Sequence, residues 1–280
     1  MFQKSYDGSP TVYLIPTPIG NLEDITLRAV NTLKMVEVIF SEDTRVTSLL
    51  LNHLNIKKKL ISSYEYNEKE NKDKFLKYLD DGHDVGIVTD RGTPIISDPG
   101  YDLVKIAIEK GYNVVGLPGP TALIPALITS GLNPSPFLFY GFLNSKQSKR
   151  NKELEELKKE KATIIFYESP HRLKETLEDI YKVFGNRRIS ISKEISKKYE
   201  EVVRGTIVDV IDKFDNIKGE FVVVVEGNTD CVDYTNISVA EHVTAYIKEG
   251  NSVNDAIKLV AKDRNVAKKE IYNIYHNISK

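Results

Sequence analysis

The sequence comprises 280 residues, of which 41% are hydrophobic and 28% are charged, and its formal net charge is −1. This length and composition are typical of a globular protein with two domains and a small third module. The balanced charge excludes a general electrostatic attraction to nucleic acid, so a nucleic-acid partner would have to be met by a local basic patch.

A single cysteine, Cys231, excludes an internal disulfide framework and suits a reducing cytoplasm. The N-terminus has no apolar core, so we expect no signal peptide. No apolar run approaches the roughly 20 residues that span a bilayer. We therefore expect a cytoplasmic protein with no membrane partner.

The first part of the chain alternates short apolar runs with amphipathic stretches. The apolar runs predict strands over residues 11–15, 36–40, 85–88 and 113–117. The amphipathic stretches predict helices over residues 25–36, 49–54, 67–79 and 101–110. We expect Asp24 to cap the first of these helices. Strands that alternate with helices form a largely parallel sheet, in which the carboxyl ends of the strands lie on one edge.

Residues 89–100, Thr-Asp-Arg-Gly-Thr-Pro-Ile-Ile-Ser-Asp-Pro-Gly, follow the third of these strands. Gly92 and Gly100 allow backbone angles that a Cβ forbids, while Pro94 and Pro99 fix others. A turn that only reverses the chain needs two or three such residues. We therefore favour a small-ligand site, which open α/β sheets form at the carboxyl ends of strands.

Polar loops follow the other predicted strands as well, and the sheet edge should collect their side chains. The residues expected there are Thr17, Pro18, Glu42, Asp43, Arg45, Asp90, Thr93, Asp98 and Thr121. Glu42 and Asp43 could act as a general base with its orienting partner. They could equally be an ordinary cap at the end of a strand, and the sequence leaves both interpretations open.

Residues 118–230 predict a second α/β unit, with strands over 163–167, 188–192 and 220–226. A helix should follow the first of these strands, with Ser169 as its N-cap and Pro170 as its first residue. A further helix is expected over 207–214. Beyond residue 237, Ser238 and Ser252 should begin helices of a small appendage. The predicted domains are 1–117, 118–230 and 231–280.

Several chemistries have no motif in this chain. It has neither a Gly-x-Gly-x-x-Gly sequence after the first strand nor a Gly-Lys-Ser/Thr loop, which argues against NAD, ATP and GTP. A pocket for S-adenosylmethionine needs no phosphate cradle, so this pattern admits that cofactor without selecting it. The five histidines are far apart, and we expect no metal site. No Gly-x-Ser-x-Gly elbow supports covalent catalysis.

Residues 141–161 contain seven Lys or Arg against four Glu. Such a cluster is by default a solvated face. Four of its cations follow Phe142 in a predicted exposed loop, where they are candidates for contacts with phosphate groups. These four are Lys146, Lys149, Arg150 and Lys152.

Six motifs occur in the order seen in one protein family, at residues 17–21, 42–45, 90–100, 118–122, 166–172 and 193–201. With them the chain resembles the bacterial ribosomal RNA small-subunit cytidine 2′-O-ribose methyltransferases, of the tetrapyrrole-methylase-like superfamily. The resemblance covers about residues 11–228, and the appendage is similar in kind. Arg91 and Thr121 depart from it, because the family more often has small residues there.

The resemblance implies a two-domain tetrapyrrole-methylase-like α/β fold with a small C-terminal helical appendage, assembled as a homodimer. It also implies that S-adenosylmethionine is held in the cleft between the domains. The residues that would line this cofactor site are Pro18, Asp90, Gly92, Thr93, Ile95, Thr121, Ala122, Tyr167 and Phe221.

The implied reaction transfers a methyl group to the ribose 2′-OH of a cytidine in 16S rRNA, as naked RNA or in the small ribosomal subunit. Glu42, Asp43 and Glu168 are the candidate bases. Arg45 and Arg172 would hold RNA phosphates or orient these carboxylates. A tetrapyrrole C-methyltransferase and a non-catalytic RNA-binding protein of ribosome assembly are the alternatives.

Overall fold

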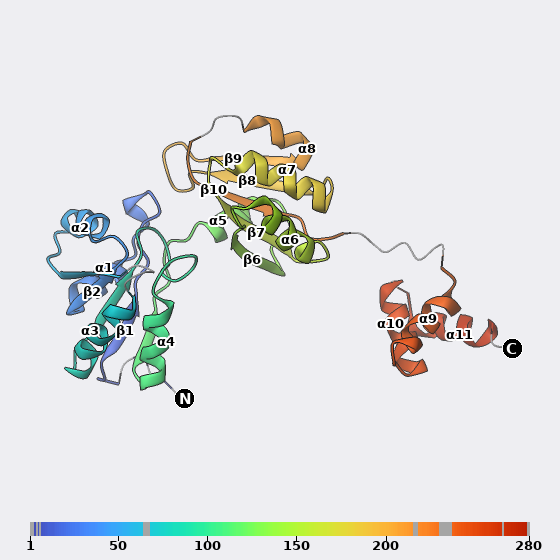
Figure 1. The fold of residues 1–280 in the computed structure, drawn as a ribbon, viewed down its shortest axis with the longest axis horizontal. Helices are drawn as coiled ribbons and strands as arrows, with labels where there is room; N and C mark the ends of the chain where they lie inside the picture. The colour runs from blue at the N-terminus through green and yellow to red at the C-terminus, as the bar shows by residue number, and fades with distance from the viewer. Residues whose placement is uncertain are drawn as a thin grey trace. The chain divides into compact units, whose positions relative to one another are not determined.

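The structure is a computed structural model that describes residues 3, 5, 7–63, 68–214, 218–229, 237–264 and 266–278. The chain forms two compact units, residues 1–228 and 229–280 (Figure 1). Cys231 and the predicted helix start at residue 67 lie outside the described residues. The predicted domain boundary at residues 117/118, within the first unit, stays a prediction.

The first sheet is entirely parallel and has the order β3-β2-β4-β1-β5. Its strands are β1 (Thr11–Leu14), β2 (Val38–Ser41), β3 (Lys59–Ser62), β4 (Val85–Val88) and β5 (Asn113–Gly116). The predicted parallel sheet is therefore confirmed, but the edge strand β3 is absent from the prediction. All four residues of β2 and of β4 are buried, as expected for strands covered on both faces.

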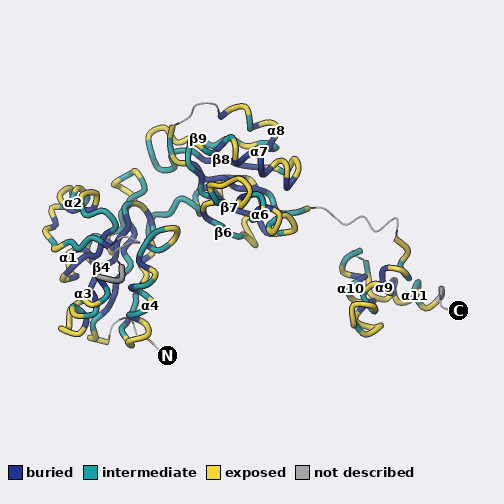
Figure 2. Tube along the Cα trace, in the orientation of Figure 1, coloured by how far each residue is buried: buried dark blue, intermediate teal, exposed yellow. Residues whose placement is uncertain are grey.

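Two pairs of helices cover the two faces of this sheet. The helices are α1 (Leu27–Met35), α2 (Thr44–His53), α3 (Glu68–Asp80) and α4 (Tyr101–Lys110). Leu33 and Leu51 bring α1 and α2 into one core cluster, and Phe75 and Leu103 bring α3 and α4 into another. Figure 2 shows the buried positions concentrated along the strands. The result is a three-layer α/β/α arrangement.

The prediction that Asp24 caps α1 is wrong. Asp24 lies in a 3-10 helix, η1 (Leu22–Asp24), and the N-cap of α1 is Thr26, whose hydroxyl accepts from the Ala29 N–H at 3.0 Å. A hydroxyl at this position satisfies a backbone donor of the first turn.

The second sheet is mixed and has the order β6-β7-β10-β8-β9. Its strands are β6 (Phe137–Phe142), β7 (Thr163–Glu168), β8 (Arg188–Lys193), β9 (Glu201–Thr206) and β10 (Phe221–Val225). Only β6 and β7 pair in parallel, and the other neighbours are antiparallel. The sequence predicted β7, β8 and β10, but neither of the edge strands β6 and β9.

Helices cover both faces of the second sheet. They are α5 (Leu123–Thr129), α6 (Gln147–Leu157), α7 (Leu173–Phe184) and α8 (Ile207–Val210). Residues of α6, α7 and α8 share one core cluster, whereas Ala126 and Leu127 of α5 belong to another.

Three local predictions about this region are wrong. The helix α7 begins at Leu173 with Arg172 as its N-cap, so Ser169 and Pro170 precede it. The helix expected over 207–214 is the single turn α8 followed by a 3-10 turn, η2 (Ile211–Lys213). The segment expected as an exposed loop after Phe142 is largely the helix α6.

The second unit packs three helices, α9 (Val239–Lys248), α10 (Val253–Asp263) and α11 (Lys268–Ile278), around one apolar cluster. The predicted caps are confirmed, since Ser238 forms a capping box with Glu241 and the Ser252 hydroxyl accepts from the Asp255 N–H at 3.2 Å.

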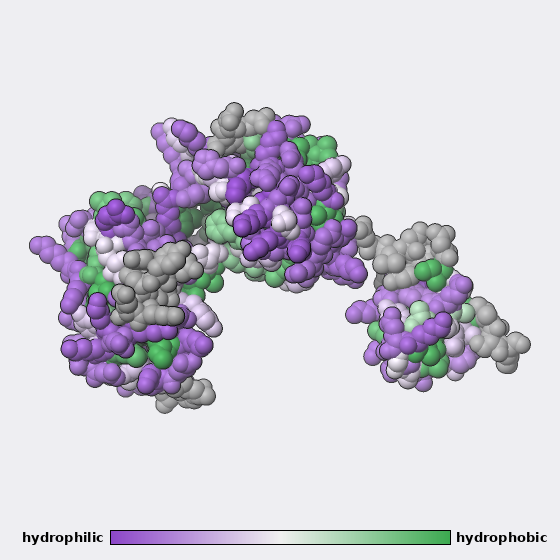
Figure 3. Space-filling model, viewed as in Figure 1, coloured by the Kyte–Doolittle hydropathy of each residue, from purple (hydrophilic) through white to green (hydrophobic). Residues whose placement is uncertain are grey.

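Within the described residues, no helix has the length and apolar character needed to cross a membrane. On the face shown in Figure 3, hydrophilic residues predominate and hydrophobic residues form small patches.

Candidate active site

A cavity of about 280 Å³ lies in the first unit, against the loop 89–100 and the ends of β7 and β10. Its walls are mainly apolar, with a few polar side chains, as in small-molecule sites. The lining residues are Ile19, Arg91, Gly92, Thr93, Ile96, Ser97, Asp98, Thr121, Ala122, Phe142, Tyr167, Glu168, Pro170, Ile195, Glu220, Phe221 and Val222.

The loop that forms one wall is held in an unusual backbone conformation. Gly92 exchanges two backbone hydrogen bonds with Thr17, at 2.9 and 3.0 Å, and has a φ of +85°. Ile95 and Ser97 also have positive φ angles, 76° and 66°. For a β-branched residue such as Ile95 this region is a true outlier, and such strain concentrates at functional sites. The backbone conformation of this loop is therefore typical of a functional site.

The predicted pair Glu42 and Asp43 touches this loop, but the two carboxylates have different partners. Glu42 Oε2 accepts from Thr89 Oγ1 at 2.8 Å and from the Asp90 N–H at 3.4 Å. Asp43 caps α2 and forms an ion pair with Arg45 at 2.6 Å. Hydrogen bonds from Arg45 lower the pKa of Asp43 to about 2. Asp43 is therefore a very weak proton acceptor near neutral pH.

Asp98 lines the cavity, and its environment favours the protonated form. Burial, reinforced by the charges of Glu42 and Asp90, raises the pKa of Asp98 to about 6, although a hydrogen bond with the Thr89 side chain opposes this shift. Burial also raises the pKa of Asp90. From the sequence we placed Asp98 at the sheet edge but named no role for it.

Glu168 also lines the cavity, but its carboxylate is fully engaged. Arg172 donates to both of its oxygens, Nε to Oε1 at 3.0 Å and Nη2 to Oε2 at 2.9 Å. Thr176 Oγ1 adds a bond to Oε2 at 2.7 Å, and the Ser169 N–H a bond to Oε1 at 2.7 Å. This arrangement stabilises a buried carboxylate and fixes the end of β7. Of the two roles left open for Arg172, orienting a carboxylate is the one these contacts describe.

Aromatic rings form another wall. Phe142 and Tyr167 meet edge to face with their centroids 5.6 Å apart, and Phe139 packs on Tyr167 at 4.9 Å. Burial raises the pKa of Tyr167, against hydrogen bonds with Thr121 and with the Leu123 backbone. Tyr167 therefore stays a neutral phenol near pH 7.

A chain of ion pairs joins the loop 89–100 to the second sheet. Arg91 pairs with Glu220, and Lys197 bridges Glu220 at 3.1 Å and Glu194 at 2.9 Å. Arg91, one of the two departures from the resembled family, thus holds two walls of the cavity together. Sequence reasoning missed Glu220 because its partner stands 129 positions away.

The structure brings six of the nine predicted cofactor residues to the cavity wall, namely Gly92, Thr93, Thr121, Ala122, Tyr167 and Phe221. Pro18, Asp90 and Ile95 are not among its lining residues. Their roles, and those of the six, stay predictions. No group of three or more His, Cys, Asp or Glu among the described residues could hold a metal ion.

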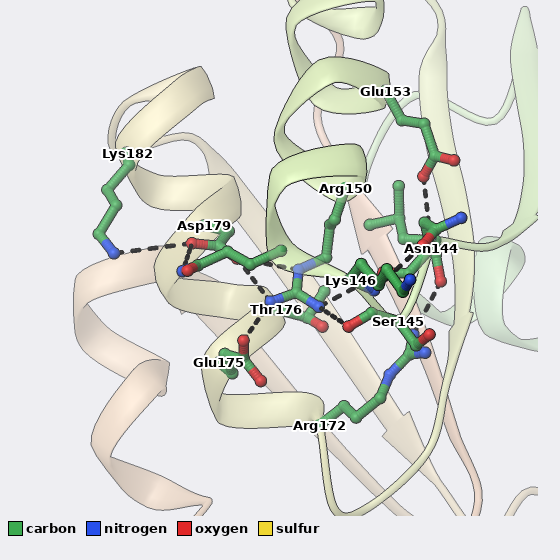
Figure 4. Close-up of polar contacts among 12 residues, drawn as sticks. Asn144, Ser145, Lys146, Arg150, Glu153, Arg172, Glu175, Thr176, Asp179 and Lys182 are labelled. Carbon is green, nitrogen blue, oxygen red and sulfur yellow. Dashed lines mark hydrogen bonds and ion pairs between the residues drawn. The ribbon is translucent and has the colours of Figure 1, made fainter.

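The predicted RNA contacts fall into two groups. Lys146 and Lys149 are exposed, and the Arg45 side chain is 89% exposed. Arg150, in contrast, is completely buried, and Figure 4 shows it pointing from α6 toward α7. The expectation that Arg150 lies in an exposed loop is therefore wrong.

Arg150 is held by two carboxylates and by backbone. Its Nε and Nη2 donate to Asp179 Oδ2 at 2.9 and 2.7 Å, and Nη2 reaches Glu175 Oε1 at 2.5 Å. Its Nη1 donates to the carbonyls of Asn144 and Ser145 at 3.4 and 3.3 Å (Figure 4). Because these contacts occupy the guanidinium, we no longer assign Arg150 to RNA.

Residues 11–211 match the family model of the Tetrapyrrole (Corrin/Porphyrin) Methylases. The chain belongs to this family. The chain is 47% identical over 285 residues to "Ribosomal RNA small subunit methyltransferase I" of Bacillus subtilis (strain 168), with 98% of each chain covered. The protein of the same name from Halalkalibacterium halodurans is 47% identical over 284 residues, again with 98% of each chain covered.

A solved structure, uroporphyrin-III C-methyltransferase from Thermus thermophilus, resembles this chain with a TM-score of 0.56. The two share 19% identity, and the match covers 77% of this chain and 94% of the other. At that identity the likeness concerns the fold alone. The predicted family and fold class are confirmed.

Proposed function

We propose that this methyltransferase uses S-adenosylmethionine to methylate the ribose 2′-OH of a cytidine in 16S rRNA, as a cytoplasmic homodimer. Near-full-length relatives at 47% identity are named for small-subunit ribosomal RNA, and this observation carries the proposal. The substrate is the RNA itself or the assembled small subunit.

The cavity chemistry fits the proposed cofactor. S-adenosylmethionine combines an adenine, a ribose and a zwitterionic amino acid with a positive sulfonium, and it supplies an activated methyl group when bound. Apolar walls and the rings of Phe142 and Tyr167 suit such a cation. The residues proposed to hold it are the nine named from the sequence, Pro18, Asp90, Gly92, Thr93, Ile95, Thr121, Ala122, Tyr167 and Phe221.

Exposed cations are the proposed contacts to RNA phosphates. Arg45 follows Asp43 at the edge of the first sheet, and Lys146 and Lys149 are exposed at the start of α6. Each would add a contact that weakens with salt and carries no sequence information. The helices of residues 237–278 are proposed as an additional RNA clamp.

A ribose hydroxyl is a poor nucleophile at neutral pH, so an acceptor for its proton is expected. Asp43 and Glu168 are poorly suited, because cationic arginines hold their carboxylates. Glu42 accepts hydrogen bonds from a neutral hydroxyl and a backbone amide. Among the three bases named from the sequence, Glu42 is therefore the one we keep.

Two measurements test this function. Calorimetry with S-adenosylmethionine should show binding, and the absence of heat would favour a non-catalytic RNA-binding protein. Incubation with unmethylated small subunits and the labelled cofactor should yield 2′-O-methylcytidine on nuclease digestion. A methylated tetrapyrrole without methylated RNA would favour the alternative C-methyltransferase.

Deletion of residues 237–280 tests the RNA clamp separately. These residues fall within the second compact unit, so the deletion should leave cofactor binding intact. We expect a lower affinity for the small subunit. Unchanged affinity and activity would assign the helices a role in stability only.

A further inference from the structure

We propose that Asp98 is the residue that accepts the proton of the substrate hydroxyl during methyl transfer, with Thr89 and Glu42 holding it in position. The inference rests on the proposed function and deepens it. It names a catalytic residue in place of the Glu42 carboxylate kept from the sequence, and it gives Glu42 a positioning role.

Three carboxylates line the cavity, those of Asp98, Glu168 and Glu220. Arg172 forms a bidentate ion pair with Glu168, and Glu220 pairs with both Arg91 and Lys197. A carboxylate held by a guanidinium or an ammonium is a weak base, because the cation stabilises its charged form. Asp98 instead has a hydrogen bond with the neutral hydroxyl of Thr89 and is repelled by the charges of Glu42 and Asp90. Asp98 is therefore the cavity carboxylate best able to take up a proton.

The groups around Asp98 reinforce this difference. Glu42 and Asp90 repel its negative charge, and the hydroxyl of Thr89 stabilises it. Tyr167 of β7 interacts electrostatically with Asp98, and Arg91, Glu168 and Glu220 line the same cavity. The result is a carboxyl group that changes protonation near pH 6. A general base works best when its proton affinity lies close to the working pH.

Thr89 links the two carboxylates. Its Oγ1 donates to Glu42 Oε2 at 2.8 Å, and the same side chain hydrogen-bonds with Asp98. A hydroxyl carries one proton, which Thr89 can give either to Glu42 or to ionised Asp98, and its hydrogen bond with Asp98 lowers the pKa of that carboxyl. Thr89 thus holds Asp98 in position and favours the ionised state that can accept a proton.

The backbone of the loop keeps Asp98 in place. Ile95 and Ser97, which have positive φ angles, stand three residues and one residue before it. A Cβ on Gly141 of β6 would stand 3.1 Å from Ser97 Oγ. This close packing of loop and strand leaves little freedom for the loop to shift. Strain held by packing in this way pre-organises a catalytic group.

In the proposed step Asp98 takes the proton from the ribose oxygen as that oxygen forms its bond to the methyl carbon. The carbon–sulfur bond breaks, and its electron pair remains on the sulfur, which becomes a neutral thioether. The proton leaves later from Asp98 to water, so charge and atoms balance.

The test compares Asp98→Asn with the wild-type chain and with Asp102→Asn. Asp102 lies four residues away on α4 and pairs with Lys72 at 3.3 Å, away from the cavity lining, so it serves as the matched control. Single-turnover methyl transfer into unmethylated small subunits is measured at saturating S-adenosylmethionine from pH 5 to pH 8.5. Cofactor affinity is measured by calorimetry on the same preparations.

In the wild type and in Asp102→Asn the rate should rise with pH through about 6 and then level off, and this rise is the acidic limb of the pH–rate profile. Asp98→Asn should lose roughly 10²-fold or more in rate, keep its cofactor affinity within about threefold, and lose the acidic limb. Thr89→Val should move the acidic limb to higher pH, because it removes the hydrogen bond that stabilises ionised Asp98. A purely structural role for Thr89 would lower the rate without moving the limb.

Three results would overturn the inference. One is an Asp98→Asn rate within about tenfold of wild type. Another is a rate loss matched by an equal loss of cofactor affinity, which would make Asp98 a cofactor ligand and leave the proposed function intact. The third is a wild-type chain that transfers no methyl group to small subunits, which would overturn the proposed function as well.

Discussion

Asp179 is a completely buried carboxylate and Asp98 a half-buried one, and the two have opposite surroundings within the first unit. Asp179 is completely buried and receives two hydrogen bonds from the buried guanidinium of Arg150. Asp98 has the carboxylates of Glu42 and Asp90 nearby and is helped by one hydroxyl. One carboxylate is neutralised by its partner, whereas the other is left with a raised proton affinity.

The difference separates a structural ion pair from a candidate reactive group. A buried charge with a matched partner contributes to a single packed arrangement, and removing the partner is strongly destabilising. A buried charge among like charges reduces stability, and such sites concentrate where chemistry occurs. We therefore expect mutations at the two positions to change stability in opposite directions.

The largest expected effect is that of Arg150→Ala. The substitution leaves Asp179 buried without its cation and frees the carbonyls of Asn144 and Ser145. We expect the free energy of unfolding to fall by about 3–5 kcal/mol, measured by urea denaturation.

Lys182→Ala is the matched control for that experiment. Lys182 contacts the other oxygen of Asp179 at 3.6 Å, but its side chain is 62% exposed. Its removal should leave the unfolding midpoint almost unchanged, as for most surface ion pairs. Equal effects of the two substitutions would show that the buried guanidinium is not what stabilises this cluster.

The next effect concerns the stability of Asp98→Asn and has the opposite sign. The folded state raises the pKa of Asp98 from 3.8 to about 6, so the folded protein binds this proton more tightly than the unfolded chain. This group therefore lowers stability as the pH rises from about 4 to about 6, and the full penalty is present above that range.

Replacement of Asp98 by Asn removes the penalty. At pH 7.5 the variant should be more stable than wild type by about 1–2 kcal/mol, a value reduced because the carboxyl is partly exposed to solvent. At pH 4 the two should unfold at nearly the same urea concentration. A variant that is less stable at pH 7.5 would contradict the contrast with Asp179. Asp43, whose pKa is lowered to about 2, should behave oppositely and contribute stability that is lost in acid.

The contrast also explains what the sequence could reveal. The alternation of apolar runs and helices predicted the parallel sheet, because its central strands are buried on both faces. The strands that the prediction omits, β3, β6 and β9, all lie at sheet edges. An edge strand such as β9, with Arg204 in its middle, tolerates polar residues and has a weak pattern.

Site residues follow the same logic. Motif spacing placed the carboxylates at the ends of strands, but whether a charge is paired depends on residues distant in the chain. Arg150 stands among exposed lysines in the sequence, and its partners Glu175 and Asp179 come 25 and 29 positions later. The raised pKa of Asp98 comes first from burial and then from the charge of Glu42, which belongs to another strand end. Neither pairing has a signal within a short stretch of sequence.

The smallest expected change in stability is that of Arg45→Ala, which compares an exposed ion pair with the buried pair of Arg150 and Asp179. Arg45 pairs with Asp43, but its side chain is 89% exposed, so water and salt screen the pair. The unfolding midpoint should hardly move. If Arg45 contacts a phosphate of the RNA, affinity for the small subunit should fall several-fold. The plot of log affinity against log salt should also become less steep, with a slope smaller in magnitude by about 1. An unchanged salt slope would show that Arg45 pairs with Asp43 alone, because the loss of a phosphate contact reduces the number of counterions released on binding.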